Sequence, residues 1–117
     1  MTYEGNIVPT PYRPSPAVRR VLRQLGADIR EARLRRDLSM EIVAERAATS
    51  RATLTRVEKG DPAVSAGILA GVLQALGMLE ALASGADSAT DRQGLEISRE
   101  SLRRRASSPR NRPKHDE

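Results

Sequence analysis

The 117-residue sequence contains no cysteine, no phenylalanine and no tryptophan, and it has a single histidine. The absence of cysteine excludes disulfides and thiolate metal sites. Because His115 lies in a polar tail, a histidine-based zinc site or catalytic triad is not expected. The sequence also shows no cluster of acidic residues and no phosphate-binding glycine loop. We therefore expect no enzymatic activity, no metal and no cofactor.

Aromatic residues are almost absent, since the only two tyrosines lie within the first twelve residues. The core must therefore consist of Leu, Ile, Val, Ala and Met, which suits small packed helices. The length allows one domain plus tails. No segment approaches the about 18 apolar residues of a membrane span, and the first residues lack a basic region followed by an apolar run. We expect a cytoplasmic, nucleoid-associated protein without membrane contact.

Basic residues exceed acidic ones by 20 to 15, which gives a net charge of +5 and a sequence pI near 10.6. Only Lys59 and Lys114 are lysines. Two explanations of this arginine preference stay open: a GC-rich genome, and selection for bidentate contacts with phosphate or guanine. Residues 1–60 carry twelve basic and seven acidic groups, whereas residues 61–117 carry eight of each. The charge distribution favours a polyanionic partner of the first half.

Residues 39–60, SMEIVAERAATSRATLTRVEKG, contain two short helical patterns joined by a turn. We predict helices over residues 40–47 and 51–59, with Ser39 and Ser50 as N-caps and Gly60 at the C-terminal end. Two helices joined by so short a turn cross steeply. The second helix presents an outer face that consists of Arg51, Ala52, Thr55, Arg56 and Lys59. This pattern is typical of a helix-turn-helix that reads DNA.

Further helices are predicted on both sides of this segment. A helix over residues 16–36 follows Ser15 and Pro16 and carries one buried apolar stripe from Val18 to Ala32, with a kink or a later start at Gly26. Two more helices are predicted over residues 65–77 and 78–83. The predicted organisation is a disordered arm over residues 1–15, a helix-turn-helix DNA-binding domain over residues 16–84, and a polar, basic, largely disordered tail over residues 85–117. A short strand or helix at residues 94–105 is the alternative within that tail.

The segment LGADIREARLRRDLSMEIVAERAATSRATLTRVEKG, followed by VSAGILAGVLQALGM, resembles the Xre family of helix-turn-helix regulators, named after phage repressors and Cro. The resemblance covers residues 25–78. It implies an all-α, five-helix, lambda-repressor-like domain in which the second and third helices read DNA. It also implies a structural ion pair between Arg33 and Glu58, where many members pair an arginine with a glutamate.

Three residues depart from the family pattern. Met40 stands where glutamine is usual, which weakens a phosphate contact but leaves the backbone amides of the first helical turn. Ala48 replaces the usual glycine of the turn, at a cost of about 1 kcal/mol if its φ is positive. Thr49 replaces a half-buried valine. None of these departures breaks the motif.

Base contacts are expected from the N-terminal, outward part of the third helix, at Arg51, Ala52, Thr55 and Arg56. Each arginine is long enough for a bidentate contact with guanine, at about 1–3 kcal/mol of discrimination per base pair. Contacts with the DNA backbone are expected from Ser39, Met40, Ser50, Thr53, Lys59, Arg35 and Arg36. For the two N-cap serines the alternative role is capping, and for the last two arginines it is a solvated helix end. Three roles stay open for the basic run at residues 103–105: nonspecific DNA binding, docking on an acidic partner surface, and a solvated run without a partner.

The predicted function is a sequence-specific repressor that binds double-stranded DNA in the major groove. Residues 59–78, together with the basic C-terminal segment, resemble HipB-type antitoxins encoded beside HipA-like serine/threonine kinase toxins. This finer resemblance implies a homodimer that represses its own operon and holds such a kinase inactive. Two alternatives stay open: a free-standing Xre-family repressor or activator without a toxin, and an adaptor that uses the fold for protein contacts only.

Overall fold

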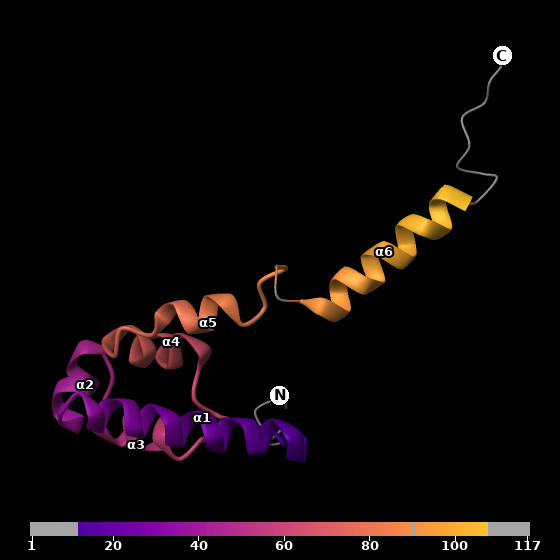
Figure 1. Ribbon diagram of the computed structural model, residues 1–117. Helices are drawn as coiled ribbons and strands as arrows, with labels where there is room; N and C mark the ends of the chain where they lie inside the picture. Colours follow the sequence, from indigo (N-terminus) through magenta and orange to yellow (C-terminus); the bar gives the residue numbers. More distant parts are fainter. Residues whose placement is uncertain (1–11, 90, 108–117) are drawn as a thin grey trace, which may run out of the picture. The chain divides into compact units, whose positions relative to one another are not determined.

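The computed structural model describes residues 12–89 and 91–107, and within these ranges the chain forms six α-helices and no strand. The helices are α1 (Pro16–Arg35), α2 (Met40–Arg46), α3 (Arg51–Glu58), α4 (Ala66–Ala75), α5 (Leu79–Ser84) and α6 (Arg92–Ser107) (Figure 1). The prediction of an all-α fold is confirmed, and the first five helices start and end within two residues of the predicted bounds. In the described ranges, no helix is both long enough and apolar enough to cross a membrane.

Serine begins each of the first four helices. The hydroxyls of Ser15, Ser39, Ser50 and Ser65 accept a hydrogen bond from the amide three residues further on, at 3.2, 3.2, 3.0 and 3.1 Å. Each bond satisfies a backbone donor that has no partner within the helix, which is worth about 1 kcal/mol per cap. In α1, Pro16 follows its cap directly, where a missing N–H has no cost.

The same four helices also end alike, with a residue of positive φ directly after the C-cap. These residues are Asp37 (φ 53°), Ala48 (φ 58°), Gly60 (φ 77°) and Gly77 (φ 74°). The amide that follows each of them donates to the carbonyl five residues earlier, at distances between 2.7 and 3.2 Å, as in a Schellman motif. Ala48 therefore holds a left-handed conformation, at a cost of about 1 kcal/mol.

The core consists of aliphatic side chains from the first four helices. Ile29 of α1, Val43 of α2, Leu54 of α3 and Val72 of α4 are the largest side chains that are almost completely buried. Burying each of them stabilises the fold by about 1.5–3 kcal/mol. Around them α1 packs on α3, and α2 packs on both α3 and α4. Leu38, in the link after α1, packs against this core.

Gly26 lies where the backbone of α1 approaches the end of α3 most closely. A Cβ atom added at Gly26 would lie 2.6 Å from the carbonyl oxygens of both Val57 and Glu58. The helix runs without interruption through this position, from Pro16 to Arg35. The predicted later start of the helix at Gly26 is therefore wrong. The glycine is present because a side chain would push two helices apart.

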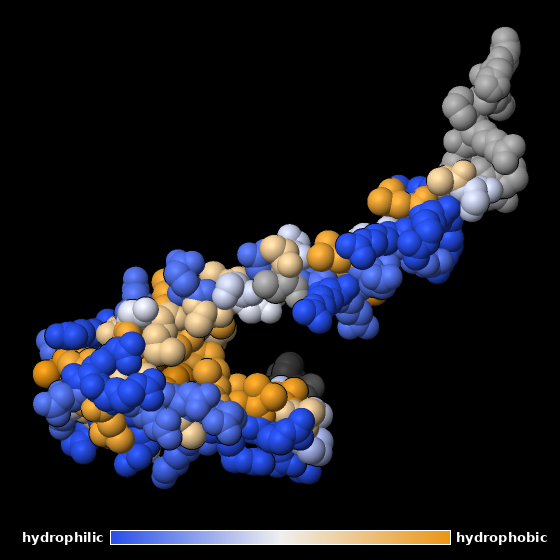
Figure 2. All heavy atoms as spheres, viewed as in Figure 1, coloured by the Kyte–Doolittle hydropathy of each residue, from blue (hydrophilic) through white to orange (hydrophobic). Residues whose placement is uncertain are grey.

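The N-terminal half of α1 differs from the predicted buried stripe. Val18 and Val21 are 40% and 59% exposed, and burial begins only at Leu22 and Leu25. Apolar surface is accordingly visible toward the N-terminal end of α1 (Figure 2). The periodicity was correct, but the first turns of α1 extend past the elements that would cover them.

The chain divides into two compact units, one up to Leu79 and one from Glu80 onward. In the second unit, α6 has no buried residue, and Leu95, Ile97 and Leu102 are all exposed. A sixth helix of 16 residues thus stands where we expected a largely disordered tail with a short strand or helix. The predicted arm at residues 1–11 and the end of the predicted tail at residues 108–117 lie outside the described residues.

Candidate nucleic-acid interface

The helix-turn-helix consists of α2, a turn at residues 47–50, and α3. Small residues make the close contact between these helices and α4: Ala44 is 4% exposed and Ala47 is 9% exposed. A Cβ added at Gly71 of α4 would lie 3.1 Å from the Ala47 carbonyl oxygen, so Gly71 marks a close approach of α4 to the end of α2. A Cβ added at Gly67, by contrast, would meet only the Ser65 hydroxyl oxygen, at 3.9 Å. These contacts fix α3 with Leu54 and Val57 inward and the opposite face in solvent.

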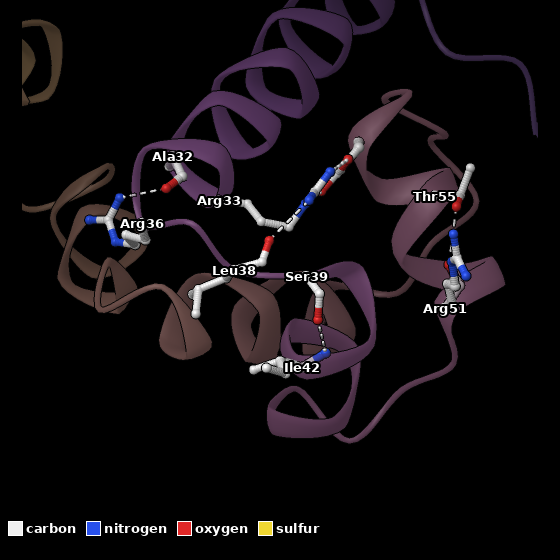
Figure 3. A network of polar contacts seen from close by, with 9 residues as sticks. Ala32, Arg33, Arg36, Leu38, Ser39, Ile42, Arg51 and Thr55 are labelled. Atoms are coloured by element: carbon white, nitrogen blue, oxygen red, sulfur yellow. Dashed lines mark hydrogen bonds and ion pairs between the residues drawn. The ribbon is translucent and has the colours of Figure 1, made fainter.

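The solvent-facing side of α3 carries the residues predicted to contact bases. Arg51, Ala52 and Arg56 are exposed, and Thr55 is half-buried. The Thr55 hydroxyl donates to the Arg51 carbonyl at 3.1 Å, along the helix (Figure 3). The structure thus brings all four predicted residues to one surface.

Both arginines of this surface are held by carboxylates, which the sequence analysis did not foresee. A guanidinium nitrogen of Arg51 lies 2.7 Å from Glu41 Oε2, and Nε of Arg56 lies 2.8 Å from Asp61 Oδ2. Glu41 belongs to the first turn of α2, so its pair with Arg51 joins the two helices of the motif, whereas Asp61 lies in the link directly after α3. The arginine side chains remain 64% and 48% exposed, and pairs of this kind contribute only about 0–1 kcal/mol.

Arg56 also changes the ionisation of its partner. The hydrogen bond that Arg56 donates, followed by the bond from the Ala63 amide at 2.8 Å, holds the pKa of Asp61 below its ordinary value of 3.8. At neutral pH the carboxylate is therefore charged, and it competes with any phosphate or base for Arg56.

Most residues predicted to contact the DNA backbone have a structural role of their own. Ser39 and Ser50 cap α2 and α3, and the Ser50 hydroxyl donates to the Thr53 hydroxyl at 3.0 Å. Met40 is half-buried and packs against the core. One guanidinium nitrogen of Arg36 donates to the Ala32 carbonyl at 2.9 Å (Figure 3), and Arg35 lies 3.8 Å from Glu31. Lys59 is the exception, because it is exposed and has no ion pair with any described residue.

Arg33 and Glu58 form the ion pair that the resemblance implied. Nε and a terminal nitrogen of Arg33 donate to the two carboxylate oxygens of Glu58 at 2.7 and 3.2 Å, and the other terminal nitrogen donates to the Leu38 carbonyl at 3.2 Å (Figure 3). Both side chains are less than a tenth exposed. The hydrogen bond with Glu58 raises the pKa of Arg33, against the opposing effect of burial. The bidentate pair joins α1 to the end of α3 and so positions the solvent-facing surface.

The basic run at residues 103–105 lies in the last turns of α6. Arg103 and Arg104 lie 2.6 and 3.8 Å from the carboxylate of Glu100, and Arg105 donates to the Ser101 hydroxyl at 3.4 Å. The charge of this run is thus partly neutralised within its own helix. Among the described residues, no group of three His, Cys, Asp or Glu side chains is placed to hold a metal ion.

Comparison with known proteins agrees with this geometry. The family described as "helix-turn-helix domain" matches residues 24–84 of the chain. No curated protein and no solved structure matched. The family match includes α2, the turn and α3 and covers just over half of the 117 residues. The chain therefore belongs to the helix-turn-helix domain family.

Proposed function

We propose that this protein is a sequence-specific DNA-binding regulator that represses transcription. The observation that supports this most strongly is the exposed side of α3 with Arg51, Ala52, Thr55 and Arg56, held in a helix-turn-helix by a buried ion pair and four capped helices. In such motifs the N-terminal part of the second helix enters the major groove. The function needs no reaction and no cofactor.

Base reading requires each arginine to exchange its carboxylate for a base edge. Releasing Arg51 from Glu41, or Arg56 from Asp61, costs about 0–1 kcal/mol per pair, since both pairs are well exposed. A bidentate contact with guanine O6 and N7 gives about 1–3 kcal/mol of discrimination per base pair. The exchange of carboxylate for base is thus favourable at a guanine that accepts both hydrogen bonds, whereas at other bases the gain does not offset the cost of release. In this way the carboxylates reduce binding to DNA of the wrong sequence.

Contacts with phosphates would set the register of α3 in the groove. The proposed backbone contacts are the amides and hydroxyls of Ser39, Met40, Ser50 and Thr53, together with the side chains of Lys59, Arg35 and Arg36. Such contacts position the protein without reading sequence. Because they displace counterions, affinity should fall steeply as salt rises.

We further propose that the protein acts as a homodimer. Two copies of α3 placed about 34 Å apart would read half-sites separated by one turn of DNA, and occupancy would block transcription. Sedimentation of the full chain, free and on an operator duplex, tests this state. A protein that binds DNA only as a monomer would contradict it.

The antitoxin role is the finer part of the proposal, and it rests on the resemblance of residues 59–78. In this role the protein would repress its own operon and hold a HipA-like kinase inactive. A kinase-like reading frame beside the gene, whose product co-purifies with this chain, would support it. If no such neighbouring gene exists, the protein would be a free-standing regulator. If it were an adaptor, it would bind other proteins but would not shift DNA in a gel.

Gel-shift titration with the DNA upstream of the gene tests the DNA-reading function. The test variant is Arg51→Ala plus Arg56→Ala, and the matched control is Arg19→Ala plus Arg20→Ala, which removes the same charge from exposed positions of α1. We expect the test variant to lose about 5- to 150-fold in affinity per arginine for the specific complex, while the control retains it. Absence of a specific complex with the unmodified protein, or equal losses in both variants, would refute the function.

A further inference from the structure

A cleft opens between α1, the start of α2 and the C-terminal half of α3. Its lining residues are Arg30, Arg33, Met40, Thr55, Glu58 and Lys59. The buried ion pair of Arg33 and Glu58 lies in its wall and joins two of the three helices. The cleft therefore has a fixed shape that does not depend on mobile side chains alone.

The cleft is positively charged, because its two remaining ionic residues are both cations. Arg33 and Glu58 neutralise each other, which leaves Arg30 and Lys59. Both are exposed, and neither forms an ion pair or side-chain hydrogen bond with a described residue. The arginines nearest in the motif, Arg51 and Arg56, are by contrast already paired.

The position of the cleft relates it to the surface that carries the base contacts. Arg51, Thr55 and Lys59 follow one another at intervals of four residues, so they form one line along α3. Lys59 stands at the C-terminal end of this line, and Thr55 both lines the cleft and belongs to the proposed reading surface. A DNA backbone that borders the groove occupied by α3 would pass this side of the motif.

We propose that Arg30 and Lys59 form a seat for one phosphate group of the DNA backbone. This proposal rests on the proposed DNA-binding function and adds to it a contact from α1, which lies outside the two helices of the motif. Two cations without an ion-pair partner among the described residues gain a phosphate without breaking such a pair. The buried pair beneath them keeps α1 and α3 at a fixed separation, so binding of the phosphate would orient α3 in the groove.

The same chemistry would accept a free inorganic phosphate ion, and the experiment separates the two sources. In the first arm, the affinity of the full chain for its upstream DNA is measured over a range of salt concentrations. The variants are Arg30→Ala, Lys59→Ala and Arg30→Lys, and the matched control is Arg46→Ala, an exposed arginine of α2 that does not line the cleft. In the second arm, inorganic phosphate is titrated into the same proteins and followed by amide NMR shifts.

We expect Arg30→Ala and Lys59→Ala each to bind specific and nonspecific DNA several-fold more weakly. The slope of log affinity against log salt should become shallower by about 0.9 for the loss of one phosphate contact, and Arg30→Lys should restore it. The control should keep the slope of the unmodified protein. Thermal melting should be the same for all variants, since these side chains are exposed.

Two results would overturn the proposal: an unchanged slope in Arg30→Ala, or an equal change in the control. Saturable binding of inorganic phosphate at Arg30 with no change of the DNA slope would assign the cleft to a free anion and would overturn it as well. If the unmodified protein binds no DNA at all, the proposed function fails, which is a different outcome from DNA binding whose salt dependence ignores Arg30.

Discussion

Replacing Gly26 by alanine should destabilise the protein, although alanine is the better helix former. The substituted Cβ would lie 2.6 Å from two backbone carbonyl oxygens at the end of α3, whereas ordinary contact begins at 3.4 Å. The helices α1 and α3 would have to separate by roughly 0.8 Å, in an interior that is packed like a crystal. Because the obstructing atoms are backbone, they cannot move aside as the tip of a flexible side chain can.

The magnitude follows from two opposing effects. Overpacking costs about 1–3 kcal/mol, and we expect a value near the upper end because both contacts are with backbone. The gain in helix propensity over glycine is about 1 kcal/mol. The net loss should be about 1–2 kcal/mol, which in a domain of this size lowers the melting temperature by roughly 5–15 °C. Separation of the helices should also loosen the pair between Arg33 and Glu58.

Two other glycine substitutions provide matched controls within the same fold. Gly67→Ala, whose Cβ would have its nearest neighbour at 3.9 Å, should stabilise the protein by up to about 1 kcal/mol. Gly71→Ala, at 3.1 Å from the Ala47 carbonyl oxygen, should fall between the two. Thermal melting of the three variants measures the order directly. If Gly26→Ala melts at or above the temperature of the unmodified protein, α1 and α3 do not approach as closely as described.

Three further predictions concern the helix-turn-helix and its ion pairs. Ala48→Gly should raise the free energy of unfolding by about 0.5–1 kcal/mol, because glycine adopts a φ of 58° without strain. A variant that unfolds at a lower urea concentration than the unmodified protein would contradict this. Arg33→Ala should lower the free energy of unfolding by about 3–5 kcal/mol, because it leaves the buried carboxylate of Glu58 without its partner. Arg35→Ala, at an exposed pair, should change it by about 0.5 kcal/mol or less. Similar losses for the two variants in urea unfolding would contradict this difference. The carboxyl of Asp61 should titrate in NMR below 3.8, and Arg56→Ala should move its pKa part of the way back. Since the folded pKa is lowered, the stabilisation from Asp61 is present above its ordinary pKa and is lost as the pH falls through the folded value. An Asp61 titration midpoint at or above 3.8 in the unmodified protein would contradict this.

The sequence predicted the parts of the fold that depend on local signals. Serine before an apolar pattern located the starts of the first four helices, and glycine located the ends of α3 and α4, because caps act within a few residues. The aliphatic composition of the core followed from the near-absence of aromatic residues. At Ala48 the sequence showed only a departure from the family pattern, and the structure was needed to establish the positive φ.

Features that depend on distant neighbours were not predictable in this way. Gly26 looks like a weak point of a helix until the end of α3 is placed against it. Val18 and Val21 continue the apolar period of α1 but are 40% and 59% exposed. The pairing of Glu41 with Arg51 appears only when α2 and α3 are placed relative to each other.

The candidate site shows the same division. Spacing along one helix was enough to place Arg51, Thr55 and Lys59 on one side of α3. Arg30 was not identified, because it lies outside the motif and becomes relevant only through the cleft that it shares with Lys59. The absence of an ion-pair partner within the described residues was the signal, and it is visible only in three dimensions.

The central claim is that α3 reads base sequence, and selection from a pool of randomised duplexes tests it most directly. The full chain and the Arg51→Ala plus Arg56→Ala variant are each used to enrich the pool, and the bound DNA is sequenced. We predict that the unmodified protein enriches a two-fold symmetric motif with half-sites about 10 base pairs apart, and that the variant loses the enriched positions while still retaining DNA at low salt. Recovery of the same motif by both proteins, or of no motif by the unmodified protein, would contradict the claim.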